Sequence, residues 1–209
     1  VTYGPSGTEY SASGCILSSH TEIRCTTSEG VGRNLRWLVS VDGQASVLSD
    51  ATTNYAAPEI ISITSSIGET KGMSSHQILG KNLATAVAGT YVELRMDGEV
   101  FPLDDTGITK GFSGAGLTTL KNDTHEVINF LLPEMAELDQ TKEISVKLGA
   151  EGKTNVEQTS NSLEFEYMPP RIDTIENIEG DPAGPTGTEM TTDLVIRGAN
   201  FGRNTYASL

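Results

Sequence analysis

The stretch Tyr55-Ala56-Ala57-Pro58-Glu59-Ile60 recurs later in the chain as Tyr167-Met168-Pro169-Pro170-Arg171-Ile172. The two aligned prolines lie 112 positions apart, from 58 to 170. That spacing is close to the ~100 residues of an immunoglobulin-like domain. Similar apolar residues follow each proline, Ile60-Ile61-Ser62-Ile63 in the first copy and Ile172-Asp173-Thr174-Ile175 in the second. A repeat with this period predicts tandem copies of one domain.

The repeat extends on both sides of the prolines. Three further pairs of segments match in the same order: 77–83 with 194–201, 22–25 with 127–130, and 36–41 with 143–148. These matches predict that residues 1–57 are the back part of a first module, 58–169 a complete module, and 170–209 the front part of a third. On this interpretation the chain starts and stops within modules, as expected of a piece of a longer protein.

Short runs of alternating apolar residues predict the strands of these modules. The clearest runs are 37–41, 91–96, 144–148, 163–167 and 194–196. Asp42-Gly43 and Asp97-Gly98 lie between such runs, and Asp-Gly favours a two-residue hairpin turn because both central residues need positive φ. The predicted fold class is therefore all-β, with immunoglobulin-like sandwiches in tandem. The segment 131–137 is the one exception, a single helical turn or a loop.

Charge and hydropathy exclude several function classes. The 209 residues contain 14 Lys and Arg against 28 Asp and Glu, giving a formal net charge of −14. An acidic chain repels both phosphate backbones and anionic lipids, so we expect neither a nucleic-acid partner nor adsorption to a membrane surface. No stretch approaches the ~20 apolar residues that a membrane-spanning helix needs, so we expect no direct insertion of this segment.

The repeated motifs resemble those of the IPT/TIG family. Modules of that family open with Pro-x-Ile, which corresponds to Pro58-Glu59-Ile60 and Pro170-Arg171-Ile172. They also contain a strand that ends in Gly-x-Asn-Phe, which corresponds to Gly80-Lys81-Asn82-Leu83 and Gly198-Ala199-Asn200-Phe201. The resemblance implies immunoglobulin-like sandwiches that serve as spacers or protein-contact modules. Some members grip DNA with basic loops, a role that the acidic composition here opposes.

The two cysteines, Cys15 and Cys25, flank a predicted hairpin. If 18–22 forms its loop, Leu17 lies opposite Ile23 and the two cysteines lie opposite each other, within the Cα distance that a disulfide accepts. A disulfide is favoured over two alternatives, a reduced buried pair and a metal site, the latter opposed by the lack of further cysteines and the position of His20 in the expected loop. In the complete module the corresponding positions are Leu120 and Phe130, an apolar pair.

Asn122-Asp123-Thr124 is the single N-x-S/T pattern in the chain. It lies at the tip of the equivalent hairpin in the complete module, where an N-linked glycan would project into water. The alternative is an ordinary Asn-Asp turn. We therefore predict Asn122 as a glycosylation site.

No residue pattern predicts a metal site or a cofactor. The histidines at 20, 76 and 125 are too dispersed for a ligand motif and are expected at the surface or in turns. The carboxylates of Asp104-Asp105, near Asp97 and Glu99, lack the spacing of a calcium loop. Ser113-Gly114-Ala115-Gly116 lacks the lysine and following helix of a phosphate-binding loop. Trp37 is expected to point into the core with Val39 and Val41 rather than to stack on sugars.

The sequence therefore predicts a protein that is not an enzyme, with no catalytic residues. We expect a structural segment of a large extracellular or cell-surface glycoprotein, in which tandem modules form a rod, a filament or a stalk. Its expected partners are other modules of the same protein and other protein subunits. Two alternatives remain: a ligand-binding ectodomain module that recognises a protein or carbohydrate, and an accessory domain of a carbohydrate-active enzyme.

Overall fold

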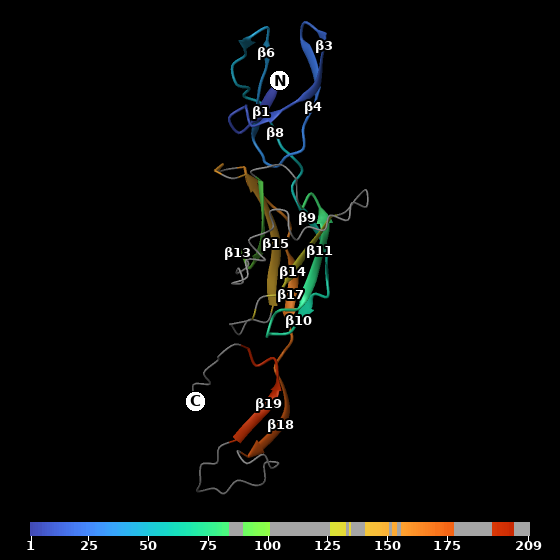
Figure 1. Cartoon of the computed structure of the whole chain (residues 1–209), viewed down its shortest axis with the longest axis vertical. Helices are drawn as coiled ribbons and strands as arrows, with labels where there is room; N and C mark the ends of the chain where they lie inside the picture. The colour runs from blue at the N-terminus through green and yellow to red at the C-terminus, as the bar shows by residue number, and fades with distance from the viewer. Residues whose placement is uncertain are drawn as a thin grey trace. The chain divides into compact units, whose positions relative to one another are not determined.

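A computed structural model describes residues 1–83, 90–100, 126–132, 134, 141–150, 152–153, 156–177 and 194–202. Every regular element within these ranges is a β-strand, which confirms the all-β class (Figure 1). The described residues include no helix that is long and apolar enough to cross a bilayer. The chain forms two compact units, one of residues 1–64, 77–130 and 143–163, the other of 65–76, 131–142 and 164–209.

The first part of unit 1 is a four-stranded sheet in the order β2-β1-β5-β8. Its strands are β1 (Thr2–Gly4), β2 (Tyr10–Ser11), β5 (Leu35–Leu38) and β8 (Thr52–Thr53). Tyr3, Tyr10 and Leu35 are buried and form the core of this part. Trp37 is half-buried and stacks on Tyr3, with ring centroids 4.4 Å apart. The predicted core position of Trp37 is therefore confirmed.

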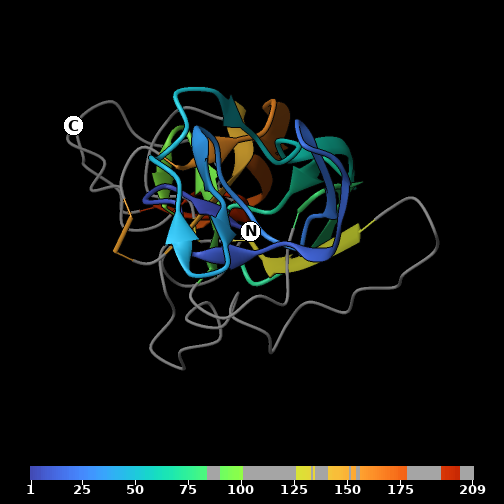
Figure 2. The same cartoon turned by 90° about the horizontal axis from the view of Figure 1, so that it is seen from above.

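Two hairpins extend from this part of unit 1. β3 (Ser13–Ser19) pairs with β4 (Glu22–Thr26), both labelled in Figure 1 within the blue N-terminal part that Figure 2 shows from above. β6 (Ser40–Val41) pairs with β7 (Gln44–Ala45) through the predicted Asp-Gly turn, in which Asp42 and Gly43 have φ of 49° and 81°. Val41 is 60% exposed, so its predicted inward position is wrong. The β5 strand ends at Leu38, and Val41 belongs to this separate two-stranded sheet.

The rest of unit 1 contains two groups of paired strands. β9 (Glu59–Thr64) pairs with β11 (Ser75–Lys81), and β14 (Glu126–Leu131) follows on the other side of β11. β12 (Thr90–Met96) pairs with β13 (Glu99–Val100) and with β15 (Thr141–Ala150), which also pairs with β16 (Gln158–Thr159). The second Asp-Gly turn, Asp97-Gly98, joins β12 to β13 as predicted. Strands β11, β14 and β15 cross the division and have their first or last residues in unit 2.

Alternation along these strands sets the core of unit 1. The fully or nearly fully buried side chains are Ile60, Ile78, Leu83, Leu94, Ile128, Phe130, Ile144, Val146 and Leu148. Within this set, every second position is taken in β14 by Ile128 and Phe130 and in β15 by Ile144, Val146 and Leu148, as expected when one face of a strand is covered. The order β13-β12-β15 in this group matches the order β2-β1-β5 in the first part of the chain.

Unit 2 contains β10 (Ile67–Gly68), most of β17 (Leu163–Tyr167), β18 (Arg171–Asn177) and β19 (Leu194–Ala199). β10 and β17 run parallel, and β18 and β19 form an antiparallel pair. Phe165 and Tyr167 are buried, and burial raises the pKa of Tyr167 to about 12. The sequence predicts a helical turn or a loop at 131–137. Leu131 is the last residue of β14. Leu132 is buried, and its N–H donates to Ser74 O.

Candidate interaction surfaces

The Gly-x-Asn motif of the first copy holds the end of β11 against the start of β9. Asn82 has a φ of 52°, a left-handed conformation that Asn tolerates better than most residues. Its Nδ2 donates to the carbonyl oxygen of Ala57, the residue before Pro58, at 3.2 Å. A Cβ at Gly80 would lie 2.1 Å from the carbonyl oxygen of Glu59, so only glycine fits there. The motif thus ties the strand end to the Pro-x-Ile segment.

The second copy has the same construction in unit 2. Asn200 has a φ of 61°, and its Nδ2 donates to the carbonyl oxygen of Pro169, the residue before Pro170, at 3.2 Å. A Cβ at Gly198 would lie 1.8 Å from the carbonyl oxygen of Arg171. Both copies therefore require Gly and Asn for the same two reasons, close backbone approach and a left-handed cap.

Strand register also agrees between the two copies. Gly80 pairs with Ile60 and Ile78 with Ile63 in β9–β11. In β18–β19, Gly198 pairs with Ile172 and Ile196 with Ile175. Each pair has a β-bulge at the same place, which leaves Ile61 unpaired in the first copy and Asp173 unpaired in the second. A bulge shifts the alternation by one residue, so the isoleucines on either side of it point to the same face.

The two copies differ in how far this face is covered. Ile60, Ile78 and Leu83 are 2%, 0% and 0% exposed. Their counterparts Ile172, Ile196 and Phe201 are 58%, 52% and 44% exposed. We define the C-terminal apolar face as Ile172, Ile175, Leu194, Ile196 and Phe201, all of which are exposed. The matched strand pairs thus differ in burial although their register is the same.

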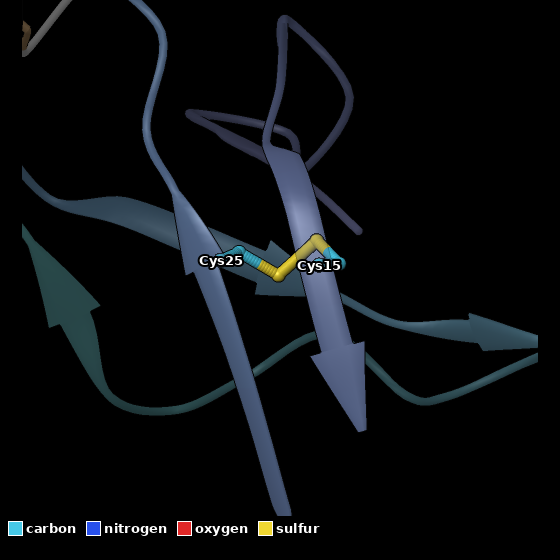
Figure 3. Close-up of a disulfide and its surroundings, with 2 residues drawn as sticks. All are labelled: Cys15 and Cys25. Atoms are coloured by element: carbon cyan, nitrogen blue, oxygen red, sulfur yellow. A yellow bond between two sulfur atoms is a disulfide. The ribbon is translucent and has the colours of Figure 1, made fainter. Parts of the chain in front are cut away.

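The β3–β4 hairpin also has exposed apolar side chains, with Leu17 and Ile23 on one face and Ile16 on the other. We define the N-terminal apolar hairpin by Ile16, Leu17 and Ile23, which are 66%, 65% and 37% exposed. Leu17 pairs with Ile23 as predicted. Cys15 and Cys25 form a disulfide between the two strands, with their Cα atoms 4.1 Å apart (Figure 3). An isolated two-stranded ribbon is only marginally stable in water, so this bond supplies stability that packing does not.

Hydrogen-bonded tyrosines stabilise the first part of unit 1. The Tyr3 and Tyr55 hydroxyls lie 2.6 Å apart, and the Tyr55 hydroxyl donates to Ser28 O at 2.7 Å. The Tyr10 hydroxyl donates to Val31 O at 2.8 Å. Burial, together with the hydrogen bond to Tyr3, raises the pKa of Tyr55 above its ordinary value. Burial likewise raises the pKa of Tyr10, and the hydrogen bonds of these tyrosines join segments that are distant in the sequence.

Gln158 links this cluster to the later part of unit 1. Its Oε1 accepts from the Gly32 N–H at 3.1 Å, and its Nε2 donates to Tyr55 O at 2.9 Å. An amide that both donates to and accepts from the backbone fixes two chain segments at once. Nothing in the sequence near Gln158 predicts this contact, because both partners lie more than a hundred positions earlier.

Glu9 holds the turn between β1 and β2. Its carboxylate accepts from the Ser6 N–H at 3.0 Å and from the Ser6 hydroxyl, and it pairs with Lys153 at 3.1 Å. Burial acts to raise the pKa of Glu9, but the hydrogen bonds from Ser6 and Lys153 outweigh it and hold the pKa at about 2. The carboxylate is therefore a structural anion, and the sequence analysis did not identify it.

The other predicted site residues divide into two groups. His20 is exposed in the turn between β3 and β4, as expected. His76, expected at the surface, is instead 4% exposed and lies edge-on to Phe165. Its ring nitrogens hydrogen-bond Ser74 Oγ and Ser65 O, so a buried imidazole is satisfied here. The remaining predictions lie outside the described residues: Asn122, His125, Leu120, Asp104-Asp105 and 113–116.

Chemistry-bearing groups do not gather into a metal site. Across the described ranges, no cluster of three or more His, Cys, Asp and Glu side chains is placed to hold a metal ion. The features that the structure brings together are therefore two apolar surfaces and a disulfide.

Comparison with known proteins assigns no family to this chain. No family model matches the sequence, and no curated protein matches it.

Proposed function

We propose that the chain is a non-catalytic structural segment built from tandem immunoglobulin-like modules of the IPT/TIG kind. Residues 58–169 would be one complete module, with the back part of another in 1–57 and the front part of a third in 170–209. Such modules would join end to end into the rod, filament or stalk of an extracellular or cell-surface protein.

One observation carries the proposal. The Pro-x-Ile and Gly-x-Asn motifs, 112 to 118 positions apart in the two copies, produce the same register, the same bulge and the same Asn-to-carbonyl hydrogen bond. Independent sequences seldom converge on all of these at once, so the recurrence supports duplication of one module. The matching strand orders β2-β1-β5 and β13-β12-β15 add support from the other part of the module.

Two features support an extracellular setting. The Cys15–Cys25 disulfide requires an oxidising compartment to persist. The strongly negative net charge favours a soluble surface without nucleic-acid contacts. The disulfide itself sits in a hairpin with exposed apolar residues, where covalent stabilisation has the greatest value.

Localisation in the producing organism tests this function. Antibodies raised against the 209-residue chain should label the outside of intact cells or their secreted material. Electron microscopy of gold-labelled samples should show the label along extended structures. Labelling confined to the interior of permeabilised cells would overturn the proposal. Glycopeptide mass spectrometry of the native protein is a second readout, since an occupied Asn122 would prove passage through a secretory route.

A further inference from the structure

The first part of the chain is joined to the complete module by a short linker whose backbone is held by side chains. Residues 54–58 separate the end of β8 from the start of β9. A linker with few contacts and a solvated backbone behaves as a hinge. Here three side-chain amides, those of Gln158, Asn82 and Asn161, bind backbone groups of residues 55–60. The linker and all three amides belong to unit 1.

Gln158 acts on the linker where it leaves the first part. The Tyr55 N–H donates to Gly32 O at 2.9 Å, just beyond the pairing of β5 with β8. In a regular antiparallel pair the Gly32 N–H would donate back to Tyr55 O. The Gln158 amide is inserted at that point, because its Oε1 accepts from the Gly32 N–H and its Nε2 donates to Tyr55 O. One side chain thus satisfies a backbone donor and a backbone acceptor of the first part.

Asn161 acts on the linker where it enters the complete module. Its Oδ1 accepts from the Ile60 N–H at 2.8 Å, and its Nδ2 donates to Ile60 O at 2.9 Å. Between these two contacts, Asn82 Nδ2 donates to Ala57 O at 3.2 Å. Pro58 is buried, and its ring fixes its own φ. The linker is therefore held on both sides of the proline.

Two further contacts join the same parts outside the linker. Val156 is 3% exposed, and a Cβ at Gly32 would lie 3.4 Å from Val156 Cβ, so the valine packs against the glycine backbone. Lys153 Nζ lies 3.1 Å from the carboxylate of Glu9, in the turn between β1 and β2. A single attachment permits rotation about itself, whereas attachments at two different loops define one orientation.

We propose that Lys153, Val156, Gln158 and Asn161 form a clamp that makes the junction of residues 1–57 with the complete module a rigid joint. The two parts of unit 1 then move as one body. This inference rests on the modules proposed above and specifies how one is fixed to the next. Repeats that meet in one orientation form a regular array, so a clamp of this kind suits a stiff rod or stalk better than a flexible tether.

Residual dipolar couplings of the full-length oxidised chain, measured by NMR, test the proposal. Couplings from β1, β5 and β8 and couplings from β12 and β15 are fitted to separate alignment tensors. In the wild-type chain the two tensors should agree in magnitude and direction, because parts of one rigid body share their alignment. Rotational correlation times from ¹⁵N relaxation of the same two sets of amides should also agree.

Removing two amides of the clamp should release the joint. In the double variant Gln158→Ala and Asn161→Ala, the two tensors should differ and the correlation time of the first part should fall. Hydrogen exchange of the Gly32 amide should accelerate about 5-fold, the factor that corresponds to one intramolecular hydrogen bond. Gln77→Ala is the matched control, because it removes a side-chain amide bond to Asn129 that does not involve the linker. It should leave the two tensors in agreement.

Two results would contradict a rigid joint built in this way. Tensors that differ in the wild-type chain would show that the junction is a hinge. Tensors that still agree in a double variant with unchanged chemical shifts in β12 and β15 would show that the amides do not fix it. If the double variant is unfolded, Gln158→Glu gives the same readout, since it keeps the acceptor for Gly32 and loses the donor to Tyr55. None of these results affects the localisation test, so failure of the clamp and failure of the proposed function are distinguishable.

Discussion

The β9–β11 and β18–β19 pairs have the same local construction in different surroundings. They share the register of their paired residues, the position of the bulge and the asparagine cap. Yet Ile78 is fully buried whereas its counterpart Ile196 is 52% exposed. Within the described ranges, β18 and β19 pair only with each other, whereas β11 also has β14 beside it.

This difference in burial distinguishes what sets the register of a strand pair from what buries its side chains. Register and bulge depend on residues inside the hairpin, namely the glycine that permits close approach and the asparagine that caps the preceding carbonyl. Burial depends on strands supplied by the rest of a module. Fully burying one isoleucine is worth about 1.5–3 kcal/mol, so three half-exposed large side chains leave several kcal/mol unrealised in the C-terminal copy. A hairpin can therefore be fully specified locally and still be incomplete energetically.

Truncating the matched isoleucines should give the largest contrast. Ile78→Ala removes buried methyl and methylene groups and should lower the free energy of unfolding by about 3–4 kcal/mol. Ile196→Ala, at 52% exposure, should change it by less than about 0.5 kcal/mol in dilute solution. Urea denaturation followed by circular dichroism measures both values.

The result could also go against the comparison. If Ile196→Ala destabilised the dilute chain as much as Ile78→Ala, the C-terminal face would already be covered within one copy. Ile61→Ala offers a control, because Ile61 is in the bulge of the buried copy but is itself 40% exposed. It should behave like Ile196→Ala.

Removing the disulfide compares the N-terminal hairpin with its buried counterpart. The double change Cys15→Ala and Cys25→Ala should cost the hairpin about 2.5–3 kcal/mol in the chain-entropy treatment of a loop this small. Because β3–β4 pairs with no other strand in the described ranges, the loss should be local. Hydrogen exchange of amides in 16–23 should accelerate about 100-fold, the factor equivalent to that free energy. Chemical reduction of the wild-type chain provides the matched comparison.

Protection that survives loss of the disulfide would mean that packing already holds the hairpin. Phe130, which the sequence repeat aligns with Cys25, is 4% exposed, so burial stabilises that position without a disulfide. The two hairpins therefore represent alternative ways to stabilise the same strand, one covalent and one by burial.

Local signals made much of this structure predictable from the sequence. Asp42-Gly43 and Asp97-Gly98 marked their hairpin turns because positive φ at both positions restricts the residue choice. Alternation located β17 at Leu163–Tyr167, and the opposition of Leu17 and Ile23 followed from a short loop. These features depend on neighbours within a few residues.

Features that depend on distant residues were not predictable. His76 is buried because Phe165, nearly ninety positions later, packs against it, and no local pattern indicates that contact. Val41 alternates like a core residue but is 60% exposed, since alternation identifies a face and not whether something covers it. Gln158 joins Gly32 and Tyr55 across more than a hundred positions. The exposed apolar side chains of the β3–β4 and β18–β19 hairpins could likewise be identified only from the exposure of each side chain in the structure.

Changing the asparagine caps should affect both copies alike. Asn82→Ala loses the hydrogen bond to Ala57 O and places alanine at positive φ, which together should cost about 1–2 kcal/mol. Asn200→Ala should cost its own hairpin a similar amount, measured by hydrogen exchange in 171–177 and 194–199. Glycine at either position restores the backbone freedom but not the hydrogen bond, so it should recover part of the loss.

If Asn82→Ala lowered stability and Asn200→Ala did not, the contribution of the asparagine cap would depend on the strands that cover the hairpin. The conclusion that the hairpin is specified locally would then fail, although the burial comparison would stand.

The smallest expected effect concerns the turn between β1 and β2, which matches the Asp97-Gly98 turn between β12 and β13 in strand order. There, Glu9 replaces a tight turn by accepting hydrogen bonds from Ser6 and pairing with Lys153. Its folded-state pKa of about 2 lies below the ordinary value of 4.5, so ionised Glu9 stabilises the fold above pH 4.5 and this stability is lost as pH falls toward 2.

Glu9→Gln should lower stability by about 1 kcal/mol at neutral pH, a value reduced from the full shift because solvent screens a surface pair. It should also flatten the fall in stability between pH 4.5 and 2, as followed by urea denaturation at each pH. Asp50→Asn, at a fully exposed carboxylate, should leave the profile unchanged. An unaltered acid profile in Glu9→Gln would mean that the turn is held by its glycines alone, in the same way as the Asp-Gly turn of the complete module.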